Sequence, residues 1–244
     1  MASDSGFLEI DGLRAYVSHP QQRTGAGVLV LPAIVGIGEH ITGVCAQLNA
    51  AGLTALAWDP HTACDPSLPV VERARFCREE MEDRPAQQEQ LRWLDYMHRE
   101  LGLASVGVIG YCLGGRMQLT LCAVEPRLKA CVAYHPSIED QPPARHLDAV
   151  ALARDIPCPV QLMYPGQDRV TSRQTFLALR EALESRPAPT IVHEYPKADH
   201  GFTEHVSPLT GEDRRDNPAN PAAAALAWPQ TAAFFRACLL GSSQ

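Results

Sequence analysis

The chain has 244 residues, of which 45% are hydrophobic and 20% charged, with a formal net charge of −7 at pH 7. This length and composition fit one globular α/β domain over residues 1–244. A net negative charge disfavours binding to nucleic acid, and no apolar run approaches membrane-spanning length. We therefore expect neither nucleic acid nor a membrane as a partner. The N-terminal residues lack the basic and apolar regions of a signal peptide, which favours a cytoplasmic location.

Strand and helix patterns alternate along the chain. A hairpin is predicted first, with strands at 7–10 and 13–17 around a turn-forming Asp-Gly pair. Apolar runs predict further strands at 28–31, 54–58, 106–111, 129–134, 159–164 and 190–195. Between and after them, helices are predicted at 39–51, 71–81, 86–101, 113–124, 172–184 and 222–240. This order predicts a doubly wound, mostly parallel sheet in a three-layer α/β/α fold.

Two segments fall outside this alternation. Residues 136–157 are polar and contain prolines, and we expect an excursion from the fold rather than a second domain. The charged segment around 211–221 either borders the pocket or is a solvated loop, and the solvated loop is favoured. The sequence does not indicate a role for the 136–157 excursion.

The stretch that predicts chemistry is Gly-Tyr-Cys-Leu-Gly-Gly at residues 110–115, between a strand pattern and a helix pattern. It has the Gly-x-Nuc-x-Gly spacing of a nucleophile elbow, with cysteine where serine is usual. The turn is tight, and glycines two residues before and two after Cys112 remove side chains that would collide there. Cys112 then stands exposed at a helix N-terminus, which favours a thiolate. A buried structural cysteine is the alternative interpretation of this motif taken alone.

A thiol nucleophile needs a base, and the base needs an acceptor that orients it. In proteins with this elbow the chain order is nucleophile, acid, histidine. Asp168 lies in the first suitable loop after a strand, and His200 lies in the loop after the last strand. Carboxyl ends of parallel strands share one edge, so we expect Cys112, Asp168 and His200 to form a triad. Considered alone, His200 would be interpreted as a surface-loop histidine, and only its combination with the elbow and Asp168 favours the triad.

Two backbone amides are expected to bind the oxyanion, those of Leu113 and Ile34. Ile34 lies in a glycine-containing loop after the 28–31 strand. His135 ends a predicted strand and either lines the substrate pocket or is a buried histidine with satisfied hydrogen bonds. The eight cysteines show no C-x-x-C pair and no zinc spacing, and a reducing compartment suits a free catalytic thiol.

Three motifs together resemble the dienelactone hydrolase family: residues 110–115, Gly-x-Asp ending at Asp168, and Asp-His-Gly-Phe at 199–202. The resemblance covers nearly the whole chain and implies an α/β-hydrolase fold without a large lid, and no cofactor or metal. It also implies a mechanism. Cys112 attacks a lactone or ester carbonyl, His200 transfers the proton, Asp168 orients His200, and water releases the acyl-enzyme.

Two positions depart from the pattern of the family's lactonase. A glutamate that contacts the resting thiol there corresponds to Ala33, so Cys112 is left to His200 and the helix dipole. An arginine that binds the substrate carboxylate corresponds to Glu204, which would repel an anionic substrate. A second substrate arginine falls near residues 73–78. The substrate pocket is expected to include Ala33, Tyr111, His135, Phe202 and Glu204.

The sequence thus predicts a cysteine-dependent hydrolase of a small-molecule ester or lactone, which need not be an anionic dienelactone. A thioesterase, or a biosynthetic acyl-transfer or lactone-handling enzyme, would use the same triad, and substrate profiling distinguishes them. A non-catalytic binding protein would be expected to carry a broken triad. A redox role is disfavoured because the motif holds no resolving cysteine. We expect a monomer or a small homo-oligomer.

Overall fold

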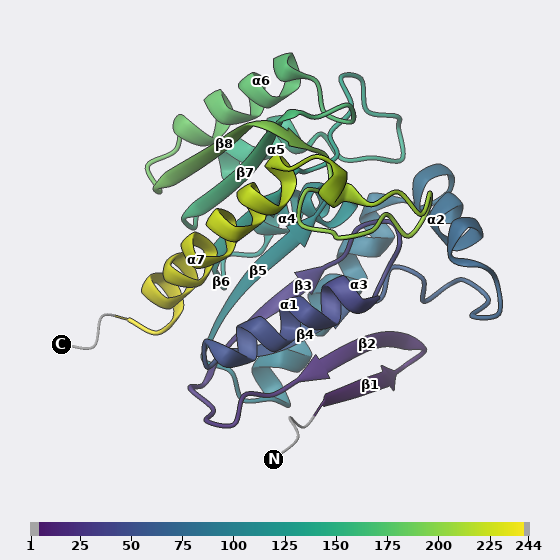
Figure 1. Cartoon of the computed structure of the whole chain (residues 1–244). Coiled ribbons are helices and arrows are strands. Elements are labelled where there is room, and N and C mark those ends of the chain that lie inside the picture. The colour runs from purple at the N-terminus through teal and green to yellow at the C-terminus, as the bar shows by residue number, and fades with distance from the viewer. Residues whose placement is uncertain (1–4, 242–244) are drawn as a thin grey trace.

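Eight strands form one sheet in the computed structural model, which describes residues 5–241 (Figure 1). Their spatial order is β1-β2-β4-β3-β5-β6-β7-β8. The strands are β1 (Ser5–Ile10), β2 (Leu13–Ser18), β3 (Ala26–Leu31), β4 (Thr54–Trp58), β5 (Ser105–Tyr111), β6 (Leu128–Tyr134), β7 (Val160–Gln167) and β8 (Thr190–Asp199). The pairs β1–β2 and β2–β4 are antiparallel, and all other neighbouring pairs are parallel. The predicted mostly parallel sheet is confirmed.

Helices cover both faces of this sheet. They are α1 (Glu39–Ala50), α2 (Val70–Glu79), α3 (Asp83–Arg99), α4 (Leu113–Val124), α5 (Ala149–Leu152), α6 (Arg173–Glu184) and α7 (Ala219–Leu239), with the 3-10 helices η1 (Ala153–Asp155) and η2 (Arg214–Asp216). Figure 1 shows α1 and α7 in front of the sheet, where they pack on side chains such as Val28 and Ile109. On the opposite face, α3, α4 and α6 pack on side chains such as Leu29 and Val108.

The two core layers follow from strand geometry. Successive side chains of a strand point to opposite faces, so each buried strand contributes to both layers. In β3, for example, Val28 and Val30 belong to the α1/α7 layer, whereas Leu29 and Leu31 belong to the other. The three-layer α/β/α arrangement is confirmed. Among residues 5–241, no helix combines the length and apolar character needed to cross a membrane.

Strands β7 and β8 extend further than their apolar runs predict. The pattern ends them at residues 164 and 195, whereas they continue to Gln167 and Asp199, which pair with each other. Pro165 and Pro196 made the sequence predict an earlier end for both strands, because proline lacks the backbone N–H that pairs neighbouring strands. A register shift between Pro165 and Gln167 accommodates the irregularity without ending the pairing.

Two helices begin three residues earlier than predicted, α3 at Asp83 and α7 at Ala219. Pro85 and Pro221 are the third residues of these helices, where a backbone N–H would have no intrahelical acceptor, so proline is tolerated. The 136–157 excursion also contains α5 and η1. Asp148 caps α5 by accepting a hydrogen bond from an amide one turn later, at 2.9 Å.

Candidate active site

The junction of β5 and α4 places Cys112 in a strained turn. Its φ is +52° and its ψ −110°, a conformation that non-glycine residues rarely adopt. A Cβ at Gly110 would overlap the carbonyl of Gly114, and a Cβ at Gly114 would overlap the carbonyl of Leu31. The two glycines are therefore required by the close approach of backbone, as the elbow motif predicts.

Hydrogen bonds to neighbouring strands hold this turn in place. The amide of Cys112 donates to the carbonyl of Tyr134 at 3.1 Å, and its carbonyl accepts from the amide of Ser137 at 3.0 Å. Tyr134 is the last residue of β6, the strand next to β5, and Ser137 follows three residues later. Cys112 is partly exposed, so its sulfur reaches the cavity at this edge of the sheet.

Asp168 and His200 come together because β7 and β8 end side by side. Gln167 pairs with Asp199, and Asp168 and His200 are the residues that follow them. Nδ1 of His200 lies 3.0 Å from each carboxylate oxygen of Asp168. With a carboxylate as its partner, Nδ1 is the donor, which directs Nε2 away from Asp168.

The Asp168 side chain is fully buried and rigidly held. Its Oδ1 accepts hydrogen bonds from the backbone amides of Val170 and Thr171, at 2.7 and 3.0 Å. These two hydrogen bonds hold the carboxylate in contact with His200. Such an arrangement orients an imidazole and stabilises its charged form.

His200 is electrostatically coupled to Cys112. Burial alone would lower the pKa of His200, but the charge of the Cys112 sulfur and the Asp168 carboxylate outweigh it and raise this pKa to about 10. Nε2 of His200 is buried, and the interaction of the ring with the Cys112 sulfur is one of the causes of this raised pKa. This nitrogen can therefore exchange a proton with a group in the cavity.

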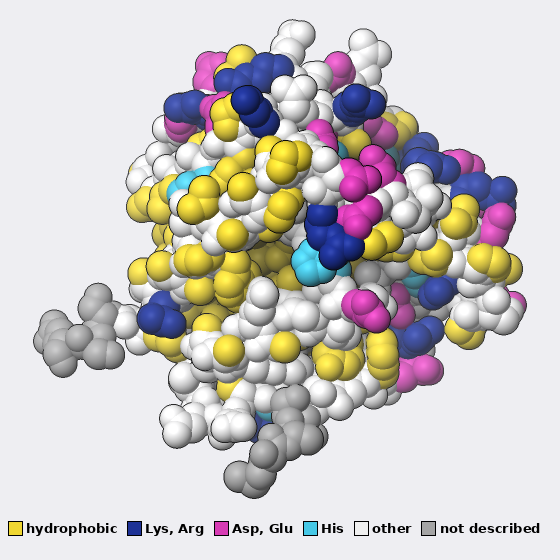
Figure 2. Space-filling view, viewed as in Figure 1, with side chains coloured by type: hydrophobic (Ala, Val, Ile, Leu, Met, Phe, Trp, Pro, Cys, Tyr) yellow, Lys and Arg dark blue, Asp and Glu magenta, His cyan; other side chains and the backbone are white. Residues whose placement is uncertain are grey.

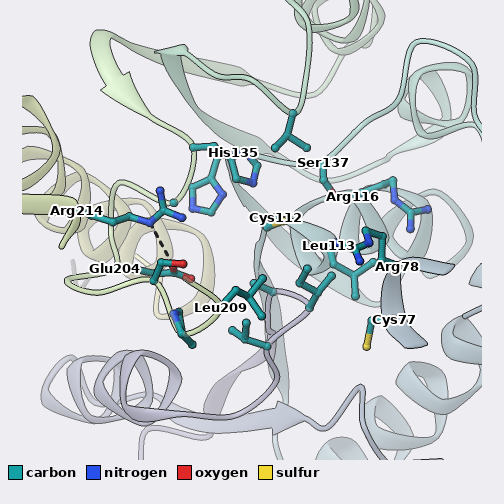
Figure 3. Close-up of a pocket in the computed structure, with 18 of the residues that line it drawn as sticks. Cys77, Arg78, Cys112, Leu113, Arg116, His135, Ser137, Glu204, Leu209 and Arg214 are labelled. Carbon is teal, nitrogen blue, oxygen red and sulfur yellow. Dashed lines mark ion pairs between the residues drawn. The ribbon is translucent and has the colours of Figure 1, made fainter. Parts of the chain in front are cut away.

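Cys112 and His200 line one cavity of about 360 Å³, here called the Cys112 cavity (Figure 3). Five other predicted site residues also line it: Ala33, Ile34, Leu113, His135 and Glu204. Sequence reasoning missed several polar residues of its wall: Arg116, Ser137, Glu139, His146, Ser207 and Arg214. Of the arginines considered at 73–78, Arg78 lines it.

The predicted oxyanion donors lie on two segments that meet at this cavity. Leu113 is the first residue of α4, where a backbone N–H has no intrahelical acceptor. The loop carrying Ile34 is fixed to α4 because the amide of Gly114 donates to the carbonyl of Pro32 at 3.0 Å. Nε2 of His61 also lies 2.8 Å from the carbonyl oxygen of Ile34.

Tyr111 and Phe202, expected in the substrate pocket, do not line the Cys112 cavity. Both are buried in the core layer under α1 and α7. Tyr111 stacks on Tyr134 with ring centroids 4.9 Å apart, and Phe202 packs on Tyr195 at 5.2 Å. Strand alternation turns Tyr111 to the opposite side of the sheet from α4, which places it outside the Cys112 cavity.

His135 is buried, with φ +34°, and lines the Cys112 cavity. Its ring centroid lies 4.7 Å from that of His200, and neither ring nitrogen has a hydrogen-bond partner within the described chain. Of the two alternatives, the structure shows the one in which His135 lines the cavity. Burial, and then the charges of His200 and His40, hold its pKa well below the usual range, so the ring is neutral.

The charged segment 211–221, expected to be solvated, borders the cavity instead. Nε of Arg214 lies 3.5 Å from Oε2 of Glu204, and both side chains are largely buried (Figure 3). Buried Asn220 holds this segment by donating to the carbonyl of Arg214 at 2.8 Å and accepting from the amide of Asp199 at 2.9 Å. Burial raises the pKa of Glu204, partly offset by Arg214 and His200.

The opposite wall contains a second buried ion pair. Arg116 lies one turn after Cys112 on α4, and its guanidinium donates to the carboxylate of Asp83 at the start of α3. The exposed fractions of the two side chains are only 5% and 1%. Asp83 also accepts from the amide of Leu147 at 2.7 Å, so the pair ties α3, α4 and the 136–157 excursion together.

Within residues 5–241, no group of three or more His, Cys, Asp or Glu side chains is arranged to hold a metal ion. All eight cysteines are free thiols. The chemistry that this arrangement offers is nucleophilic attack by a thiol next to a histidine and an acid, with two backbone amides nearby.

A mostly parallel sheet with a strained strand-to-helix turn at Cys112 after one strand, and an acid and a histidine after two later strands, has the arrangement of an α/β-hydrolase. Residues 13–239 match the family model described as "Dienelactone hydrolase family", and the chain belongs to this family. The fold and the family expected from the motifs are therefore confirmed. The corresponding activity is hydrolysis of lactones or esters.

Individual relatives are similar over most of their length. A protein of Bradyrhizobium sp named "Probable 2-oxo-3-(5-oxofuran-2-ylidene)propanoate lactonase" is 28% identical over 238 residues, 93% of this chain and 90% of that protein. A "Carboxymethylenebutenolidase homolog" of Xenopus tropicalis is 28% identical over 200 residues, 80% and 77% of the two chains. The solved structure "Putative Dienelactone Hydrolase from Klebsiella pneumoniae subsp. pneumoniae MGH 78578" has a TM-score of 0.76 at 23% identity. It covers 96% of this chain and 99% of that one, and supports the fold alone.

Proposed function

We propose that the protein hydrolyses a lactone or ester through a covalent intermediate on Cys112, with His200 as the proton carrier and Asp168 as its orienting acid. One observation carries the proposal. The strained Cys112 opens into the same cavity as His200, whose Nδ1 is held by the buried carboxylate of Asp168. Acyl transfer requires a nucleophile, a base that exchanges a proton with it, and an acid that orients the base.

The raised pKa of His200 bears on the resting state of the site. Near neutral pH the imidazole keeps its proton and so carries a positive charge and a proton next to the Cys112 sulfur. The position of the lactonase glutamate is held by Ala33, which supplies no carboxylate. In this proposal the thiolate is maintained by His200 and by the N-terminus of α4.

The reaction proceeds in two stages, acylation of Cys112 and hydrolysis of the acyl-enzyme. The thiolate sulfur attacks the carbonyl carbon, and the resulting oxyanion accepts hydrogen bonds from the amides of Leu113 and Ile34. His200 then gives its proton to the leaving alkoxide, and the C–O bond breaks to leave a thioester on Cys112. Water attacks the thioester as His200 takes its proton, and the acid is released with the thiolate restored. With a lactone, the alcohol stays attached to the acyl group.

The charge balance of the Cys112 cavity favours an uncharged substrate. Each arginine of its wall, and His146, has an acidic partner within 4 Å. The pairs are Arg78–Glu79 at 3.2 Å, His146–Glu139 at 2.7 Å, Arg214–Glu204 at 3.5 Å, and Arg116 with Asp83. A substrate carboxylate would therefore find no unpaired cation there. We infer that a neutral ester or lactone is preferred over an anionic dienelactone.

The test is hydrolysis of p-nitrophenyl acetate, a neutral lactone, an anionic dienelactone and an acyl thioester by the wild type and by Cys112→Ala. We expect turnover of the neutral oxygen esters that disappears in Cys112→Ala. Cys238→Ala, a partly exposed thiol on α7 outside the cavity, is the matched control and should retain activity. Full turnover in Cys112→Ala would remove the proposed nucleophile, and turnover of the thioester alone would indicate a thioesterase.

The same proposal bears on where the protein works. A catalytic thiol must stay reduced, and all eight cysteines are free. We infer that it acts in a reducing compartment such as the cytoplasm. Mass spectrometry after alkylation of freshly lysed cells would report the fraction of Cys112 that is reduced.

A further inference from the structure

A second cavity, of about 710 Å³, opens between α1, α7 and residues 203–208. Figure 2 shows this face of the molecule hollowed between the two helices, with hydrophobic side chains in the hollow. The ends of β5 and β6 contribute Tyr111 and Tyr134 to it, and α7 contributes Trp228. No step of the mechanism above uses this cavity.

The second cavity adjoins the Cys112 cavity. Four residues line both: Ala33, Val35, Glu204 and Pro208. The first two belong to the loop proposed to supply the oxyanion amide, and the other two to the segment that follows His200. A substrate whose carbonyl lies over Cys112 can therefore extend past Glu204 into a larger space.

Most residues that line the second cavity are uncharged, and its acidic residues are Glu39, which is exposed, and Glu204. Ile41 and Val44 of α1 are buried and apolar, and they face the aromatic rings of the sheet and of α7. Burial, and then the charge of His205, lower the pKa of His40 to about 4, so this imidazole is neutral at pH 7. Glu204 is neutralised by its ion pair with Arg214.

Two glycines leave this space open. A Cβ built on Gly38 or Gly43 would meet no atom within 4 Å, and neither residue has a positive φ. The fold therefore does not require glycine at either position. Gly43 lies inside α1, where glycine is less favourable than alanine. Gly43 is exposed and lines the second cavity, so a larger side chain at this position would extend into that space.

We propose that the second cavity binds an unbranched alkyl or aryl arm of the ester substrate whose carbonyl is attacked in the Cys112 cavity. This inference rests on the proposed function and names the substrate class: esters with one long, uncharged arm. Burial of each further methylene of that arm is expected to raise kcat/KM about fourfold until the cavity is filled. The arm belongs either to the acyl group or to the alcohol, and the experiment below distinguishes the two.

The test fills the cavity from α1 with Gly43→Phe. One substrate series varies the acyl group, from p-nitrophenyl acetate to the octanoate. The other varies the alcohol, from ethyl to octyl acetate, followed by proton release. In the wild type we expect kcat/KM to rise along one series, and that series identifies the arm. In Gly43→Phe we expect the octanoate-to-acetate or octyl-to-ethyl ratio to fall at least tenfold.

Ala46→Phe is the matched control, because Ala46 lies on the same helix, is exposed and does not line the cavity. It should keep the wild-type ratio. Gly43→Leu repeats the comparison with a smaller side chain if Gly43→Phe fails to fold. The inference is overturned if the wild type shows no preference for long arms, or if the Gly43 variants change long and short esters alike. Failure of the proposed nucleophile would instead appear as activity in Cys112→Ala with every ester.

Discussion

The ion pair between Glu204 and Arg214 is expected to set the charge preference of the enzyme. Glu204→Gln keeps the shape of the side chain but removes the carboxylate that lies 3.5 Å from the guanidinium. Arg214 is then left with an uncompensated positive charge in the wall of the Cys112 cavity. We expect this change to convert a preference for neutral lactones into acceptance of anionic ones.

The size of the effect follows from the geometry. Two unit charges at this distance interact by about 5 kcal/mol at an effective dielectric constant of about 20, which sets a ceiling. The two side chains retain exposed fractions of 12% and 21%, so solvent screens part of that energy. We expect Glu204→Gln to stabilise the transition state of an anionic substrate by about 1.4–2.8 kcal/mol. This corresponds to a rise of about 10- to 100-fold in kcat/KM relative to a neutral substrate.

The assay compares kcat/KM for an anionic dienelactone and a neutral lactone across pH. Burial raises the pKa of Glu204 above its ordinary value of 4.5, so this carboxylate loses its charge at a higher pH than an exposed one. In the wild type, the anionic-to-neutral ratio should therefore rise as the pH falls toward that pKa, while the substrate is still ionised. In Glu204→Gln the ratio should be high throughout and nearly independent of pH.

Glu139→Gln provides the control. Glu139 lines the same cavity and pairs with His146, but its side chain is 48% exposed, so its removal should change the ratio little. If Glu204→Gln left the ratio unchanged, or shifted it no more than Glu139→Gln, the charge argument for the cavity would be refuted.

Three further predictions concern stability and the elbow. Asp83→Asn strands the buried guanidinium of Arg116 and should lower the free energy of unfolding by about 3–5 kcal/mol, measured by urea denaturation; a loss below about 1 kcal/mol would contradict burial of the pair. The imidazole of His200 should titrate near pH 10 by NMR and at lower pH in Cys112→Ala; a midpoint near 6.5 in the wild type would disprove the coupling. Because this folded-state pKa is raised, the stabilisation is complete below about pH 6.5 and is lost as the pH rises toward 10. Gly114→Ala should abolish soluble expression or activity, because its Cβ would overlap the carbonyl of Leu31.

The features that sequence reasoning identified are those specified by local spacing. The elbow depends on residues 110–115 alone, because the two glycines and the strained Cys112 act within one turn. Placing Asp168 and His200 together needed only the rule that parallel strands end at one edge of the sheet. The sheet and its helices followed from apolar runs of sufficient length.

The features that sequence reasoning missed depend on tertiary packing. Nothing local shows that Asn220 draws the charged segment back to Asp199 and so brings Arg214 into the cavity. The elbow motif does not specify which face of the sheet Tyr111 points to, and in the structure it points into the core layer under α1 and α7. Because of Pro165 and Pro196, the sequence did not predict the last residue pairs between β7 and β8.

The central claim is that Cys112 carries the acyl group, and it is tested most directly by trapping that intermediate. The enzyme is mixed with p-nitrophenyl acetate, quenched in acid within the steady state, and digested with trypsin. The peptide Glu100–Arg116 contains Cys112 as its only cysteine. We expect an acetyl group on this peptide that neutral hydroxylamine removes, as for a thioester, and that accumulates further in His200→Ala. Turnover without any acyl group on this peptide, or with a hydroxylamine-resistant one on another residue, would contradict the account.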